Sequence, residues 1–225
     1  MIKSIHDKNT KNRILELIKE QEKLSKNLFL KDSFSKIEKI AGVDQGYIGD
    51  RILSCIVVMD YKNFRLIEIS SAEMKISFPY ISGLLAYREM PVILKAYKKL
   101  KIKPDVLLVD GHGIAHPRNF GLASHLSLCI RKPTIGVAKN KLIGNYKKPE
   151  KVLKEEKLVY NGKIVGYALK TKENCKEIFI SPGNFISLKT ALRIVKNSIR
   201  NEKLPEPLRL AHKFVNEKLK WQNLQ

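Results

Sequence analysis

The chain has 225 residues and a formal net charge of +21, because 43 Lys and Arg residues outnumber 22 Asp and Glu residues. Hydrophobic residues make up 44% of it, which is enough for a substantial core, and we expect one domain over residues 1–225. The charge favours a nucleic-acid partner, since a bias toward lysine alone would raise Glu as well. A membrane partner is not expected, because the sequence has neither a run of about 18 apolar residues nor a basic amphipathic helix with aromatic anchors.

The first half of the chain predicts a helix, a three-stranded meander and a second helix. Residues 9–27 carry apolar side chains at helical spacing. The three strand-like segments that follow are one ending at Asp44, one at 51–61 and one at 64–75. Short connections with turn residues join them, so we expect antiparallel pairing. Residues 82–101 predict a helix that Pro91 kinks or divides.

The second half predicts a buried sheet with covering helices. Residues 104–111 form an almost wholly apolar run, which is typical of a central parallel strand. The remaining predicted elements are a helix at 119–132, a strand at 133–140, a hairpin at 157–171 that turns at Asn161-Gly162, a strand at 176–183, and helices beginning near Ser187 and Pro205. The fold class is therefore α/β, a mixed sheet with a β-β-β-α-β-α-β core that is flanked by helices.

Two aspartates are predicted at the ends of apolar strands, Asp44 after KIAGV and Asp110 after VLLV. A carboxylate is unfavourable inside a strand that is buried on both faces, and open α/β sheets bind ligands beyond the carboxyl ends of their parallel strands. If these two strands are parallel neighbours, the aspartates converge. Glu89, on the intervening helix, then supplies a third oxygen ligand.

A cluster of three carboxylates predicts a bound cation, because the carboxylates repel one another without one. Mg²⁺ and Mn²⁺ prefer oxygen ligands, and such ions promote in-line phosphoryl displacement. A single Asp at a strand end is more often a cap or turn residue. Two of them with a helical Glu, on a chain of charge +21, favour a catalytic site that uses Mg²⁺, with Mn²⁺ as a second metal that supports activity.

Five motifs of the chain resemble those of the endonuclease V family and occur in the family's order. They are AGVDQGY (41–47), PYISGLLAYRE (79–89), LLVDGHGIAHPR (107–118), GVAKNKLIG (136–144) and ISPGNFISL (180–188). The resemblance spans most of the chain, from about Ile40 to His212. It implies a ribonuclease H-like fold and a metal-dependent DNA repair nuclease. The implied reaction is cleavage of the second phosphodiester bond 3′ to a deoxyinosine, which leaves 3′-hydroxyl and 5′-phosphate ends.

The resemblance also implies roles for single residues of the catalytic centre. It maps the metal-binding acids of the family onto Asp44, Glu89 and Asp110, and its catalytic centre also onto His116 and Lys139. By their chemistry, the imidazole can bond a phosphate oxygen and the ammonium can meet the charge of the scissile phosphate.

A further histidine and a glycine-rich loop complete the implied centre. His212 matches a position near the family's catalytic centre, and we expect it to help hold the metal. Gly111 and Gly113 permit nucleic acid to approach the backbone closely. Between the two histidines of this loop, the role of fixing its conformation is expected of His112 rather than of His116.

PYISG resembles the wedge with which this family separates strands at the lesion. Tyr80 can stack on an exposed base and Pro79 can stiffen the loop, although a rigid turn before a helix is a simpler interpretation of the same residues. The expected base-contacting residues are Pro79, Tyr80, Ile81, Gly83, Leu85, Gly111 and Gly113. The chain departs from the family pattern at Ser82, where Pro is commoner, and at Asn184, where His is usual, so no function of that His is carried over.

Other functions remain open at this stage. An inosine-specific endoribonuclease and a non-catalytic nucleic-acid-binding module fit the same fold. The three intact acids favour an enzyme over the module, and a base-sized pocket is not needed by a general junction resolvase. The choice between DNA and RNA depends on local contacts to the 2′-hydroxyl.

Cysteine usage and the N-terminus predict a reducing cytoplasm. Cys55, Cys129 and Cys175 are scattered and lack CxxC spacing, and residues 1–15 lack the apolar segment of a signal peptide. The expected partner is DNA containing deoxyinosine, or RNA containing inosine. No obligate protein partner is expected.

Overall fold

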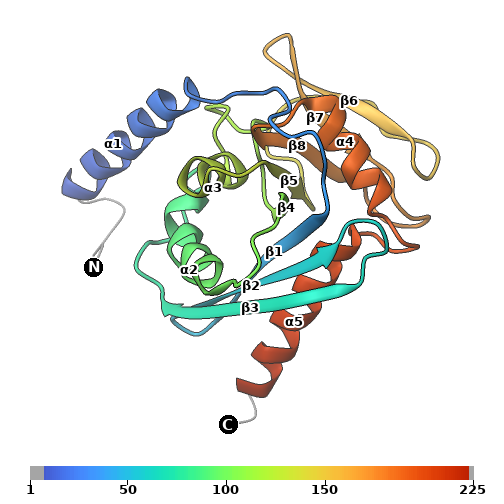
Figure 1. Ribbon diagram of the computed structural model, residues 1–225. Coiled ribbons are helices and arrows are strands. Elements are labelled where there is room, and N and C mark those ends of the chain that lie inside the picture. The colour runs from blue at the N-terminus through green and yellow to red at the C-terminus, as the bar shows by residue number, and fades with distance from the viewer. Residues whose placement is uncertain (1–7, 223–225) are drawn as a thin grey trace.

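The computed structural model describes residues 8–222, so the first seven residues of the stretch inspected for a signal peptide lie outside the description. Its elements follow the predicted order (Figure 1). Within the described residues, the helices are α1 (Lys8–Ser25), α2 (Leu85–Lys99), α3 (Leu122–Ile130), α4 (Leu188–Asn197) and α5 (Glu206–Gln222). The strands are β1 (Lys39–Ile48), β2 (Arg51–Asp60), β3 (Leu66–Lys75), β4 (Val106–Asp110), β5 (Thr134–Ala138), β6 (Glu155–Tyr160), β7 (Lys163–Leu169) and β8 (Ile178–Asn184).

The predicted meander of β1, β2 and β3 is confirmed, but its first strand is longer than expected. The prediction that β1 ends at Asp44 is wrong, since the strand continues to Ile48. Its last four residues keep pairing with β2, from Gln45 opposite Ser54 onward. The turn is only Gly49-Asp50, with Gly49 at φ 53°. Residues 45–48, which were expected to belong to the connection, therefore extend the strand. Asp44 therefore lies inside β1 rather than at its end.

Two local expectations concern a turn and a proline. The Asn161-Gly162 turn between β6 and β7 is confirmed, and both residues have positive φ, 48° and 73°, as a type I′ turn requires. The prediction that Pro91 divides the second helix is wrong, because α2 runs through it. Pro91 is exposed, so water can satisfy the carbonyl that the proline leaves without a donor.

The eight strands form one sheet in the order β3-β2-β1-β4-β5-β8-β7-β6. β4 pairs in parallel with both β1 and β5, and the other described pairings are antiparallel. The mixed α/β sheet expected from the sequence is thus confirmed. Because β1, β4 and β5 are parallel neighbours, their carboxyl ends meet at one edge of the sheet.

The helices cover both faces of the sheet because successive strand residues point to opposite sides. In β4, Leu107 and Val109 pack with α2 and α3, whereas Val106 and Leu108 pack with α4 and α5. These four side chains are fully buried. Figure 1 shows the two helix pairs on either side of the central strands. The central strands are therefore held in place by helices on both faces of the sheet, and so are the residues at the carboxyl ends of these strands.

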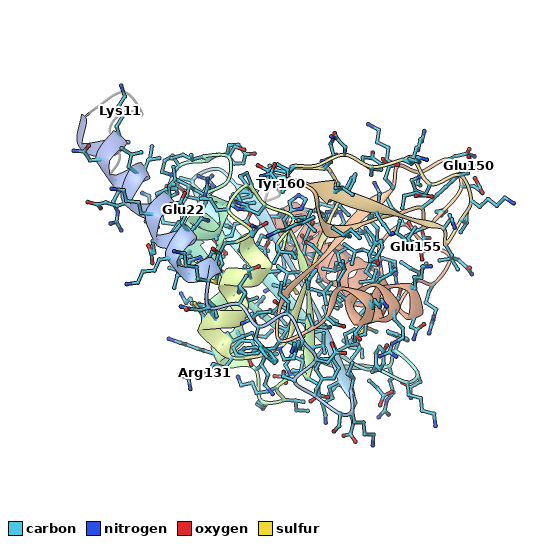
Figure 2. The ribbon with its side chains drawn as sticks, turned by 90° about the horizontal axis from the view of Figure 1, so that it is seen from above. Lys11, Glu22, Arg131, Glu150, Glu155 and Tyr160 are labelled. Atoms are coloured by element: carbon cyan, nitrogen blue, oxygen red, sulfur yellow. The ribbon has the colours of Figure 1, made fainter. Side chains whose placement is uncertain are left out.

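α1 lies at the periphery, beyond α2 and α3 (Figure 1). Figure 2 shows Lys11 and Glu22 on this helix at one end of the molecule and Glu150 and Glu155 at the other. Within the described residues, no helix has the length and apolar character needed to cross a membrane.

Candidate active site

Three carboxylates meet at the edge where the parallel strands end. Val43 pairs with Val109 in the parallel register of β1 and β4, which places the next residues, Asp44 and Asp110, side by side. Glu89 projects from α2, the helix that packs over β1, β2 and β3. Asp44 and Glu89 are only 3% and 5% exposed.

Each carboxylate bonds a side chain from outside the cluster. Lys139, which follows β5, donates from Nζ to Asp110 Oδ2 at 2.6 Å. His212 of α5 donates from Nδ1 to Asp44 Oδ2 at 2.7 Å. Tyr47 donates from its hydroxyl to Glu89 Oε1 at 2.6 Å.

Burial and mutual repulsion make this cluster electrostatically unfavourable. Burial, and then the charge of Asp110, raise the pKa of Asp44 to about 6. The pKa of Glu89 rises to about 7, chiefly through burial. Burial alone would lower the pKa of Lys139, but the neighbouring Asp110 and Asp44 raise it overall. The site thus holds more negative charge than its single ammonium compensates.

The donor set fits a hard divalent cation. Glu89 Oε2 is buried and has no hydrogen-bond partner among the described residues, and the three acids supply oxygen ligands only. In residues 8–222, no three acidic, histidine or cysteine side chains are placed as a metal-ligand group. The three carboxylates bond Lys139, His212 and Tyr47. Asp44, Glu89 and Asp110 are the residues that could hold such an ion.

His212 is placed differently from the other expected ligands. Its Nδ1 bonds Asp44, and its Nε2 accepts from Asn216 Nδ2 at 3.1 Å. Both ring nitrogens are therefore used within the protein. In this arrangement the side chain orients Asp44, as a histidine behind a metal ligand does.

A cavity of about 420 Å³ opens above the carboxylates. Besides the three acids, the expected site residues that line it are Tyr80, Gly83, Leu85, Gly111, His116 and Lys139. Those that do not line it are Pro79, Ile81, Gly113 and His212. The cavity thus joins the acids to the tyrosine of the PYISG segment.

Gly113 is packed into the fold rather than facing the cavity. A Cβ at this position would lie 2.1 Å from the Pro182 carbonyl oxygen, and its backbone N–H donates to Ser181 Oγ at 2.9 Å. Its φ is not positive, whereas Gly111 has φ 155°. Close approach of β8, and not of a ligand, is what requires glycine at Gly113.

Tyr80 lies in the loop of residues 76–84, between β3 and α2, and is 69% exposed. Gly83 in this loop has φ 77°. Its carbonyl accepts from His116 Nε2 at 3.0 Å and from Arg118 Nη2 at 2.6 Å. Two donors on one carbonyl fix the base of the loop while the tyrosine projects into solvent.

Both histidines of GHGIAH bond a backbone group of another segment, His112 that of Asn140 and His116 that of Gly83. His116 fixes the loop, since its Nδ1 also accepts from the Arg118 backbone at 3.3 Å. Burial lowers its pKa to about 4, so the ring is neutral. His112 lines the cavity with a buried Nδ1 that bonds no described residue, and burial lowers its pKa to about 4 as well. Sequence alone did not separate the two, because both lie within GHGIAH.

Comparison with known proteins assigns the family. The family model of endonuclease V matches residues 22–213. The chain belongs to the endonuclease V family. Endonuclease V of Dictyoglomus turgidum is 46% identical over 205 residues, covering 91% of this chain and 90% of that protein.

Two solved endonuclease V structures resemble the chain closely. That of Bacillus subtilis has a TM-score of 0.89 at 34% identity and covers 94% of both chains. That of Ciona intestinalis, in complex with a 23mer DNA containing an inosine followed by a ribo-adenosine, has a TM-score of 0.82 at 30% identity and covers 93% of this chain and 98% of that one. The ribonuclease H-like fold implied by the sequence is confirmed.

Three residues of the endonuclease V site were not singled out from the sequence. Tyr47 and Arg118 lie in the quoted motifs, AGVDQGY and GHGIAHPR, so their position was a usable signal. Gln21 of α1 lies outside these motifs, so no signal in the sequence pointed to it. It is fully buried, lines the cavity and accepts from Arg118 Nε at 2.6 Å.

The two departures from the endonuclease V pattern lie in different places. Ser82 lines the cavity beside Tyr80. Asn184 pairs with Thr134 at the start of β5, which is the opposite end of the sheet from the carboxylates. Its Oδ1 accepts from the Phe29 backbone at 2.7 Å, so it fastens the segment after α1 to the sheet.

Proposed function

We propose that the protein is a divalent-metal-dependent endonuclease that cleaves DNA at the second phosphodiester bond 3′ to a deoxyinosine, leaving 3′-hydroxyl and 5′-phosphate ends. The observation that carries the proposal is the placement of Asp44, Glu89 and Asp110 around one cavity with an exposed tyrosine on its rim. The inosine-containing DNA bound by the Ciona intestinalis relative supports it. The net charge of +21 supports attraction to a polyanion.

The three carboxylates would hold Mg²⁺, or Mn²⁺ in its place. Such an ion, when bound, supplies an activated water and stabilises the charge that develops on the phosphoryl oxygens. Besides the acids, two lysines line the cavity, Lys141 and, beside Asp110, Lys139. Its ammonium lies 2.6 Å from Asp110, where it also meets the negative charge of the scissile phosphate.

The loop that carries Tyr80 separates the lesion from its neighbours. The phenol stacks on bases and makes no contact that distinguishes one base from another. Identity is read in the cavity between Gly83, Leu85 and Gly111. Hypoxanthine presents an O6 acceptor and an N1–H donor, whereas adenine presents the reverse, so backbone groups there can tell them apart.

The test is cleavage of paired oligonucleotides that differ by one base, inosine or adenine. With Mg²⁺ or Mn²⁺ we expect a single cut in the inosine strand, one nucleotide further 3′ than the bond next to the lesion. Chelation of the metal should abolish it. Equal cleavage of both strands, or a cut elsewhere, would contradict the proposed specificity.

RNA is a second candidate substrate, and one observation favours it. The DNA in the Ciona intestinalis complex carries a ribo-adenosine directly after the inosine, so that relative accepts a 2′-hydroxyl at this position. Cleavage rates of two matched strands, one with deoxyadenosine and one with riboadenosine after the inosine, decide between DNA and RNA. A large rate advantage for the ribo strand would make the protein an endoribonuclease.

The proposed site of action is the cytoplasm, because the proposed substrate is DNA and the cysteines form no disulfide among the described residues.

A further inference from the structure

A second cavity, of about 390 Å³, adjoins the one above the carboxylates. Four lysines and a single glutamate, Glu177, line it together with Asn140, Tyr146 and Phe179. The lining therefore carries a net charge of +3. Lys141, Lys148 and Lys176 are all exposed. We call the cavity that these three lysines line together with Tyr146 the basic pocket.

The floor of the basic pocket is held in place by the fold. Asn145 exchanges both backbone hydrogen bonds with Val159 of β6, at 2.8 and 2.9 Å. The Tyr146 ring packs edge-on against Phe179 with centroids 5.2 Å apart, and its hydroxyl donates to Glu177. This bond occupies one oxygen of Glu177, and the four lysines of the lining outnumber this one carboxylate.

An aromatic ring lies among these cations. Lys141 Nζ is 5.7 Å from the centre of the Tyr146 ring. Ammonium groups beside an aromatic ring are the combination that binds single-stranded nucleic acid, since the cations contact phosphates and the ring contacts bases or sugars.

The basic pocket continues the proposed active site across the sheet. Lys139, Asn140 and Lys141 line both cavities. Along the sheet edge Asp44 of β1 comes first, then Asp110 of β4, Lys139 after β5 and Lys176 before β8. Neighbouring strands are about 4.8 Å apart, so β8 lies roughly 10 Å beyond β4. That distance corresponds to a very few nucleotides of extended strand.

We propose that the basic pocket binds the phosphates of the substrate strand on the 3′ side of the scissile bond. The inference rests on the proposed function, which fixes the direction of the strand. The lesion lies at Tyr80 and the cut lies 3′ of it, over the carboxylates. A strand that continues in the same direction reaches the basic pocket, where three ammonium groups hold the part that leaves with the 5′-phosphate.

The test measures how much affinity the 3′ part of the strand contributes. Binding of labelled single-stranded inosine oligonucleotides is followed by anisotropy, with Asp110→Asn in every protein to prevent cleavage. One oligonucleotide ends just after the scissile bond, a second extends about six nucleotides further 3′, and a third extends equally in the 5′ direction. The protein is compared with the triple variant K141Q/K148Q/K176Q.

A matched triple variant controls for net charge. K62Q/K98Q/K189Q removes three exposed lysines that follow β2, end α2 and begin α4, at the opposite end of the sheet. We expect the 3′ extension to raise affinity about tenfold in the parent and in this control, and to have little effect in K141Q/K148Q/K176Q. Each lost phosphate contact lowers the slope of log K against log salt by about 0.7, so that slope should fall by about 2 in the triple variant.

The outcomes separate the two proposals. A 3′ gain that survives in K141Q/K148Q/K176Q, or a loss of the 5′ gain instead, overturns the assignment of the basic pocket. If K62Q/K98Q/K189Q loses the 3′ gain to the same extent, the gain depends on the total charge of the protein and not on the basic pocket, and the assignment is overturned as well. Cleavage by the proteins with native Asp110 is read in parallel, and a parent that does not cut inosine strands defeats the proposed function by itself. Oligonucleotides that fail to bind the parent defeat both.

Discussion

Each carboxylate of the candidate site bonds a side chain from outside the cluster. Asp110 bonds Lys139, Asp44 bonds His212 and Glu89 bonds Tyr47. These contacts orient the three carboxylates toward a common space without neutralising them, because Lys139 is the only one of the three partners with a permanent charge. The second oxygen of Glu89 stays unbonded, which is unfavourable unless a ligand uses it.

We predict that Asp110→Asn abolishes cleavage while lesion binding is largely kept. The substitution keeps the shape of the side chain and removes a charge that the cation needs. Cleavage and anisotropy measured on one inosine oligonucleotide check this. The matched control is Asp60→Asn at the opposite end of the sheet, whose Oδ1 can still accept from the Lys62 and Asn63 backbone. Near-normal turnover of Asp110→Asn with Mg²⁺ would rule out the three-carboxylate site.

We predict that Tyr80→Ala weakens binding by roughly ten- to a hundredfold, since stacking on an aromatic contributes about 1–3 kcal/mol per base. The preference for inosine over adenine should survive, because the phenol does not read base identity. Trp221→Ala is the matched control, as this tryptophan is also exposed, at 73%, and does not line the cavity. If Tyr80→Ala removed the preference and kept the affinity, the tyrosine would be the reader.

At the scale of elements, the loop of residues 76–84 depends on two distant parts of the chain. Arg118 connects it to α1, with one bond to the Gly83 carbonyl and one to Gln21. His116 adds a third bond from the loop after β4. The exposed tyrosine is thus presented by a fixed base, which reduces the entropy lost when a base stacks on it.

We predict that Arg118→Lys weakens binding severalfold and lowers the free energy of unfolding by about 1–2 kcal/mol, since an ammonium cannot span both acceptors. The effect on binding should largely vanish in a Tyr80→Ala background, because both changes act on the same stacking contact. A double-mutant cycle measures this coupling. The control, Arg65→Lys in the exposed β2–β3 turn, should change neither quantity. Additive effects of Arg118→Lys and Tyr80→Ala would separate the arginine from the loop.

For the molecule as a whole, buried histidines connect the fold to pH. His125 of α3 packs between Tyr87 and Phe120, with ring centroids 5.3 and 5.2 Å away. Burial lowers its pKa below the ordinary 6.5. The unfolded chain therefore binds a proton at this ring before the folded chain does. Its contribution to stability is complete above pH 6.5 and declines as the pH falls below that value.

We predict that His125→Phe makes the protein less sensitive to acid. Phenylalanine keeps the ring contacts and cannot be protonated, so the variant should lose less stability than the parent between pH 7.5 and 5.5. The difference between the two proteins should widen as the pH falls below 6.5. Urea unfolding at several pH values measures it. Parallel pH profiles for the two proteins would show that this histidine is protonated in the fold.

The sequence by itself determined the order of the elements and the family, and it supplied the candidate site residues. Alternating apolar residues, the Asn161-Gly162 turn and the apolar run before Asp110 act over neighbouring residues, so they could be read without a structure. The convergence of Asp44, Glu89 and Asp110 could be proposed in the same way, whereas Lys139 was proposed only through the resemblance of its motif to that of the family. The physical reason is that strand pairing, turn geometry and burial of a short run depend on local patterns.

Only the tertiary structure decided where Asp44 lies within its strand and which distant side chains contact one another. Asp44 lies inside β1 because β2 continues to pair beyond it, and a strand end cannot be read from one strand. Gln21 and Arg118 are 97 residues apart in the chain, yet Arg118 Nε donates to Gln21 Oε1 at 2.6 Å. His116 holds the Tyr80 loop because its ring bonds the Gly83 carbonyl, 33 residues away in the chain. Contacts of this kind depend on how the whole sheet and its helices pack, and no local pattern specifies them.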